Sequence, residues 1–178
     1  MMNRCWLLLL LLFPSCEENY SARPTFEKSL YAVISPEEFE LVPFPKGEAF
    51  SEGWELFVTE HEIGLNVPVP QFSDTKVIDL PHRVPKPNSA FWYRKTLNLE
   101  PGMLVLNADD GGQVWVNGER RPNFEGEVFP ITESGEVEVT IRVINNAMSG
   151  GLRSVRWVSE SVWESYQKKL WSSGIQDG

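Results

Sequence analysis

The feature that most constrains this chain is a strand–turn–strand pattern that ends in an Asn-Gly dipeptide. An apolar run over residues 104–108 meets an acidic, glycine-rich break at 109–112, and a second run over 114–116 is closed by Asn117-Gly118. Asn and Gly both tolerate positive φ, so Asn-Gly after an apolar run is the strongest short-range hairpin signal. The stretch therefore predicts antiparallel strands joined by tight turns.

Most other patterned segments also predict short strands. The clearest alternates Val137, Val139, Ile141 and Val143 with Glu138, Thr140 and Arg142. A period of two is typical of an antiparallel strand with one buried and one solvated face. Further strands are expected at residues 53–58, 77–80, 91–99, 103–108, 129–131 and 152–158. Many short strands with no helix between them indicate an all-β fold, an antiparallel β-sandwich or jelly roll.

One helix is expected, after the last strand. Ser159 is a candidate N-cap, and Val162, Trp163, Tyr166 and Leu170 would share one face. We therefore predict four regions: a leader at 1–15, a tether at 16–25, the sandwich at 26–158, and a short C-terminal amphipathic helix and tail at 159–178.

The first residues have the pattern of a secretory leader. Arg4 precedes an apolar stretch at 6–13, which is too short to span a bilayer as a stable helix. Pro14-Ser15 before Cys16 resembles the lipobox of bacterial lipoproteins, which implies cleavage before Cys16 and its acylation. The acidic residues after Cys16 resemble a surface-export signal. The alternative is simple secretion with a free Cys16.

Charge and cysteine content exclude several classes of function. The chain has 178 residues and a formal net charge of −9, without a basic cluster. This argues against nucleic-acid binding and against electrostatic adsorption to anionic lipid. Cys5 would leave with the leader and Cys16 would carry lipid, so no thiol remains for a disulfide, a metal site or a nucleophile.

Six ordered segments resemble the N-terminal, galactose-binding-like jelly roll of family 2 glycoside hydrolases. They are Asp79-Leu80-Pro81-His82, Trp92-Tyr93-Arg94-Lys95-Thr96-Leu97, Leu104-Val105-Leu106-Asn107-Ala108-Asp109-Asp110, Val114-Trp115-Val116-Asn117-Gly118, Pro130-Ile131-Thr132, and Val139-Thr140-Ile141-Arg142-Val143-Ile144-Asn145-Asn146. The resemblance covers roughly half of the chain and implies a sugar-binding sandwich. Similar domains also precede other secreted hydrolases, including metallophosphoesterases.

The chain departs from that family in three respects. Arg83-Val84 follows the histidine, where the family often has an acidic and an aromatic residue. Residues 26–75 match no part of it. The immunoglobulin-like and barrel domains that carry the family's catalytic carboxylates have no room here, so the resemblance implies an accessory role rather than catalysis.

The Asp109-Asp110 pair allows two interpretations. Asp and Gly are turn formers, and the favoured interpretation is a chain reversal. The alternative is a weak Ca²⁺ site built from carboxylate and carbonyl oxygens. Adjacent carboxylates on a strand end point in opposite directions, which argues against a pair of catalytic acids.

Aromatic residues are the other candidate binding groups. Six tryptophans remain after the leader, and sugar rings stack on exposed indoles. Trp92 falls on the polar phase of its strand, and Trp115 is out of phase with its neighbours. Either ring could be exposed; the favoured alternative is that both are covered, since strands that carry Trp usually bury it.

Two polar residues, Asn146 and Arg153, flank the glycine-rich loop that follows the clearest strand. In jelly rolls of this type, loops at one end hold the ligand, although docking of a neighbouring domain is an equal alternative. His61 and His82 are too few for a clustered metal or phosphoesterase site, and Ser149 lies in no nucleophile elbow. Both histidines are predicted to be structural or surface residues.

The sequence features favour two functions. The first is a non-catalytic carbohydrate-binding module of a cell-surface lipoprotein, with Trp92 or Trp115 stacking on the glycan and Asn146, Arg153 and the acidic turn orienting its hydroxyls. The second is the N-terminal accessory domain of a larger secreted hydrolase, a glycoside hydrolase or metallophosphoesterase, whose catalytic part is absent from this chain. A complete enzyme is the least favoured, because the sequence has no nucleophile–base set, metal cluster or phosphate loop.

Overall fold

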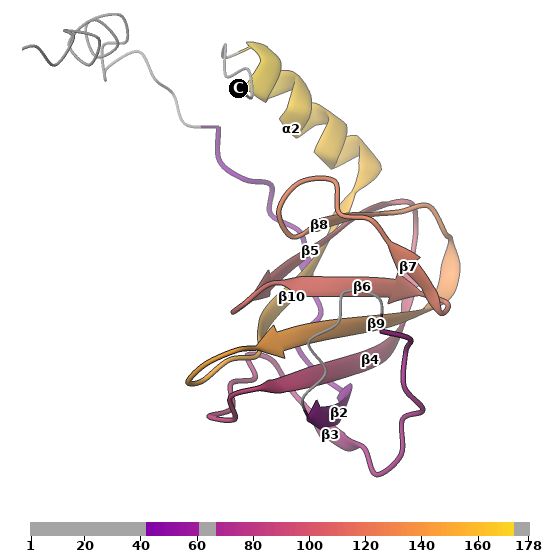
Figure 1. Cartoon of the computed structure of the whole chain (residues 1–178). Helices are drawn as coiled ribbons and strands as arrows, with labels where there is room; N and C mark the ends of the chain where they lie inside the picture. Colours follow the sequence, from indigo (N-terminus) through magenta and orange to yellow (C-terminus); the bar gives the residue numbers. More distant parts are fainter. Residues whose placement is uncertain (1–41, 61–66, 173–178) are drawn as a thin grey trace, which may run out of the picture. The chain divides into compact units, whose positions relative to one another are not determined.

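The computed structural model describes residues 42–60 and 67–172 (Figure 1). The chain divides into two units, 1–41 and 42–178, and all described residues belong to the second. The predicted leader, Cys16 and the tether lie outside the described residues, as does His61.

The described residues form two antiparallel sheets, which confirms the predicted all-β sandwich with one C-terminal helix. The first sheet has the order β1 (Glu48–Ala49), β10 (Leu152–Ser159), β5 (Gly102–Ala108) and β8 (Val128–Ile131). The second has the order β3 (Lys76–Ile78), β2 (Trp54–Glu60), β4 (Ser89–Leu99), β9 (Gly135–Asn145), β6 (Gly112–Val116) and β7 (Glu119–Arg121). Helix α2 (Glu160–Ser172) follows β10 directly.

The Asn-Gly turn forms as predicted, between β6 and β7. Asn117 has φ 50° and Gly118 has φ 81°, the two positive values that a two-residue type I′ hairpin requires. The Asn117 side chain adds a function that the pattern did not predict. Its Oδ1 accepts the Glu138 N–H at 2.9 Å, and its own N–H donates to the Glu138 carbonyl at 2.9 Å. The hairpin is therefore tied to β9.

Strand β9 confirms the period of two only on its inner face. Val137, Val139, Ile141 and Val143 are buried in the core between the sheets. Glu138 is exposed as expected, but Thr140 and Arg142 are buried, so the prediction of a solvated outer face is wrong for that half of the strand. The physical reason is that an aromatic layer covers the second sheet on its outer side, as described below.

Helix α2 is amphipathic, but only its first half packs on the sandwich. Trp163 is buried against Val105, Val128 and Val158, whereas Tyr166 is only partly buried. Val162, expected on the same face, is 43 % exposed. Within the described part of the chain, no helix is both long and apolar enough to cross a membrane.

Candidate functional site

Three loops meet at one end of the sandwich. They are the 79–88 connection between β3 and β4, the 109–111 turn between β5 and β6, and the 146–151 loop between β9 and β10. Val84 and Gly150 exchange two backbone hydrogen bonds of 2.9 and 3.1 Å, which join the first loop to the third. The Asp109 N–H donates to the Gly151 carbonyl at 3.2 Å, which joins the second loop to the third.

Glycine permits this close approach. Gly151 has φ 147°, in the region that disfavours other residues, and a β-carbon there would overlap the His82 carbonyl. Asn145 holds the same loop from below: its Nδ2 donates to the Lys86 carbonyl at 2.7 Å and to the Met148 carbonyl at 3.4 Å. The loops are therefore fixed by backbone contacts and by one buried amide.

Four of the six predicted ligand-binding residues come together here, and we call Asp109, Asp110, Asn146 and Arg153 the polar loop cluster. The Arg153 guanidinium forms an ion pair with Asp109. Asp110 Oδ2 accepts the Asn146 N–H at 2.9 Å. Asn146, Asp110 and Arg153 are exposed, and Asp109 is half-buried. The cluster therefore presents both donors and acceptors to solvent.

The acidic pair turns the chain, as its sequence favoured, and the turn leads from β5 in the four-stranded sheet to β6 in the six-stranded sheet. Gly111, with φ 90°, completes the turn between the two strands. The two carboxylates bind different protein groups, Arg153 and the Asn146 backbone, rather than one common point. Within residues 42–60 and 67–172, no group of three or more His, Cys, Asp or Glu side chains is placed to hold a metal ion.

His82, predicted to be a structural or surface residue, is half-buried and forms a polar contact beneath the same loops. Its Nδ1 lies 2.9 Å from the Tyr93 hydroxyl, which accepts the Leu152 N–H at 3.3 Å. Burial lowers the pKa of His82 and raises the pKa of Tyr93 well above its usual range. Both groups are therefore neutral at pH 7, and together they link the first loop to β4 and β10.

The favoured interpretation of Trp92 and Trp115, that both rings are covered, is confirmed, and the alternative of a sugar stacked on either ring is wrong. Trp92 is 0 % exposed and Trp115 is 4 % exposed. Their ring centroids are 5.2 Å apart on the outer side of the second sheet, where Phe57, Val67, Val69 and Phe72 pack over them. The segment that contains Val67 and Val69 covers the strands, so neither indole has a face free for a sugar.

Sequence reasoning missed one apolar group of the site, Met148. It lies in the 146–151 loop beside Asn146, is 84 % exposed, and has φ 59°. Positive φ is unusual for a long side chain and is favoured at functional loops. The Met-Ser-Gly-Gly sequence predicted only a loop. The exposure of Met148 depends on the hydrogen bonds by which Asn145 and Val84 fix that loop.

The comparisons with known proteins give no family for this chain. No protein-family model matches it, and no curated protein matches it significantly.

Proposed function

We propose that this chain is a non-catalytic carbohydrate-binding module of a cell-surface lipoprotein, and that it binds glycans through the polar loop cluster. The observation that carries the proposal is the convergence of Asp109, Asp110, Asn146 and Arg153 at one end of the sandwich. Three separate loops contribute to that end, and each is held by backbone hydrogen bonds.

The chemistry of the cluster suits hydroxyl groups. A sugar hydroxyl donates one hydrogen bond and accepts others, so it pairs with carboxylates, amides and guanidinium groups alike. Asp110 provides acceptors, Arg153 provides donors, and the Asn146 amide provides both. Met148 adds an exposed apolar surface beside Asn146, where the C–H face of a sugar ring would pack. This arrangement replaces the aromatic platform that the sequence suggested.

The test is glycan binding by the complete mature protein. A panel of oligosaccharides that contain galactose, glucose, mannose or xylose is screened, and the best ligand is then titrated by calorimetry. We expect Arg153→Ala to weaken binding by about ten-fold or more, because a hydrogen bond to a charged group is lost. Asn146→Ala should weaken binding in the same direction.

Matched controls come from the same domain. Arg120 on β7 and Asn98 on β4 are exposed, and neither belongs to the cluster. Arg120→Ala and Asn98→Ala should leave the affinity unchanged. The proposal is wrong if no glycan of the panel binds, or if Arg153→Ala and Asn146→Ala bind as tightly as the two controls. Intact mass spectrometry tests the lipoprotein part separately, through the mass added at Cys16.

A further inference from the structure

Helix α2 and two segments far from it in sequence form an aromatic groove. We give this name to Phe44, Phe124, Trp163, Tyr166 and Trp171, which line one pocket of about 470 Å³ together with parts of α2 and β8. Phe44 lies 5.9 Å from Trp163 and 5.5 Å from Tyr166 between ring centroids. The Phe124 ring centroid lies 6.4 Å from that of Trp163.

The rim of this groove is open to solvent. Trp171 is 68 % exposed, Phe124 is 59 % exposed, and Phe44 is 40 % exposed. Every other described tryptophan is at most 9 % exposed. Three of the large apolar side chains exposed in the described residues thus gather at a single place, and contiguous exposed apolar patches mark interaction sites in soluble domains.

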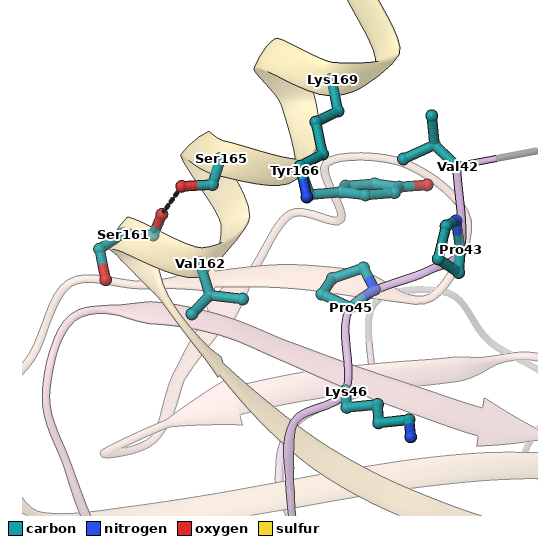
Figure 2. Close-up of a pocket in the computed structure, with 9 residues that line it drawn as sticks. All are labelled: Val42, Pro43, Pro45, Lys46, Ser161, Val162, Ser165, Tyr166 and Lys169. Atoms are coloured by element: carbon teal, nitrogen blue, oxygen red, sulfur yellow. Dashed lines mark hydrogen bonds between the residues drawn. The ribbon is translucent and has the colours of Figure 1, made fainter. Parts of the chain in front are cut away.

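A second hollow of about 380 Å³ adjoins the groove along α2. Figure 2 shows Tyr166 between the helix and the segment that carries Pro43 and Pro45. Val162 and Lys169 line this hollow as well. The apolar surface therefore continues across Tyr166 and follows both sides of the helix.

Charges of both signs surround the groove: Glu125 lines it, and Lys168 forms an ion pair of 3.7 Å with Glu164. The outer half of α2 carries Lys168 and Lys169, and its carboxylates, Glu160 and Glu164, lie in the half nearest the sandwich. Arg156 lies over the Phe44 ring, at 5.6 Å from its centroid. Aromatic side chains combined with lysines, whose stems are apolar, are typical of surfaces that lie in the interfacial layer of a bilayer.

The chain also leads from this groove towards the predicted anchor. Phe44 forms one wall, and about 25 residues separate Val42 from Cys16, a contour of at most about 90 Å even when fully extended. A lipid on Cys16 would hold the groove within that distance of the bilayer, which raises its effective concentration at the surface.

We infer that the aromatic groove docks on the interfacial layer of a phospholipid bilayer. Trp171 and Phe124 enter among the headgroups and upper acyl chains, while Lys169 extends to the phosphates. The inference rests on the proposed lipoprotein only for the proximity of the membrane. The contact itself is apolar, so it agrees with a net charge of −9 and does not need anionic lipid.

The test uses the mature protein, purified from the membrane fraction and reconstituted with phosphatidylcholine vesicles. Trp171 is the natural reporter, since the other described tryptophans are buried. Vesicles whose acyl chains carry bromine near the headgroup should quench part of the tryptophan emission. Trp171→Ser should remove at least half of the tryptophan emission that the brominated vesicles quench. Phe124→Ser should reduce the quenched emission.

Val77→Ser is the matched control, because Val77 is an exposed apolar residue on β3, outside the groove, at 74 % exposure. It should leave quenching unchanged. The inference is overturned by equal emission in brominated and plain vesicles, or by quenching that Trp171→Ser does not change. It is also overturned if the groove is covered by a second copy or by another domain, detected as a complex that Trp171→Ser dissociates. Mass spectrometry of the same sample measures the mass that a lipid adds at Cys16. Loss of the anchor and loss of docking are therefore distinguished.

Discussion

Two aromatic clusters in this molecule differ in their exposure to solvent. Trp92 and Trp115 lie on the outer face of the six-stranded sheet and are buried, while Trp171 at the end of α2 stays open. The difference lies in what can reach each cluster. Side chains on a sheet face stand in rows, so one extended segment can lie across several of them. A helix end that projects past its support has no such neighbour.

Residues 67–72 have a sequence that suits an extended segment lying across Trp92 and Trp115. Pro68 and Pro70 alternate with Val67 and Val69; proline favours an extended backbone, and both valines pack against the buried cluster. Further along, Phe72 contacts Phe57 with 5.7 Å between centroids, and the Arg94 guanidinium lies 4.2 Å from the Phe72 ring centroid on the other side. Glu55 in turn holds Arg94 with two hydrogen bonds of 2.9 and 2.6 Å.

The largest expected effect compares the two tryptophans directly. Trp92→Ala removes a fully buried ring and its 3.1 Å hydrogen bond from Nε1 to Thr59 Oγ1, so it should cost about 3–5 kcal/mol of unfolding free energy. Trp171→Ala should change stability by less than about 0.5 kcal/mol, as is usual for exposed positions. Urea denaturation followed by circular dichroism measures both. Equal losses would show that the comparison is wrong.

A substitution with an intermediate expected effect tests whether the segment that contains Phe72 protects Trp92 and Trp115. Phe72→Ala should cost about 1–2 kcal/mol, less than a fully buried phenylalanine, because Phe72 is only partly buried. It should also expose Trp115 and raise the quenching of native emission by acrylamide. Phe124→Ala is the matched substitution in the open groove, and it should alter neither quantity appreciably. A Phe72→Ala protein with unchanged quenching would mean that the segment does not protect the indoles.

These contrasts also explain how far the sequence could predict the molecule. The strands and the Asn117-Gly118 turn follow from local periodicity and positive φ, which depend on near neighbours. The polar loop cluster was predictable because consecutive strands of a sandwich place alternate loops at the same end. The burial of Trp92 and Trp115 was the favoured interpretation, but the segment that covers them and the burial of Arg142 could not be predicted, since residues 67–72 lie about 20 to 75 residues earlier in the chain. The groove likewise needs Phe44 and Phe124, which no local pattern brings to α2.

The smallest expected effect is a pH dependence of the unfolding free energy that arises in the sandwich and not in the groove. Burial lowers the pKa of His82 below its usual 6.5, so below pH 6.5 the unfolded chain takes up a proton before the folded one does. Stability should therefore fall as the pH drops from 6.5 through the folded-state pKa, and His82 adds no slope above 6.5.

His82→Gln isolates this contribution, because glutamine does not titrate and the other ionisable groups are unchanged. The variant should show a flatter dependence of unfolding free energy on pH between 6.5 and about 5, where carboxylates begin to titrate. Trp171→Ala should retain the full wild-type slope, since Trp171 makes no contact with the His82–Tyr93 pair among the contacts of the described residues. If the slope of His82→Gln equals that of wild type, protonation of His82 does not control the acid stability of the sheets.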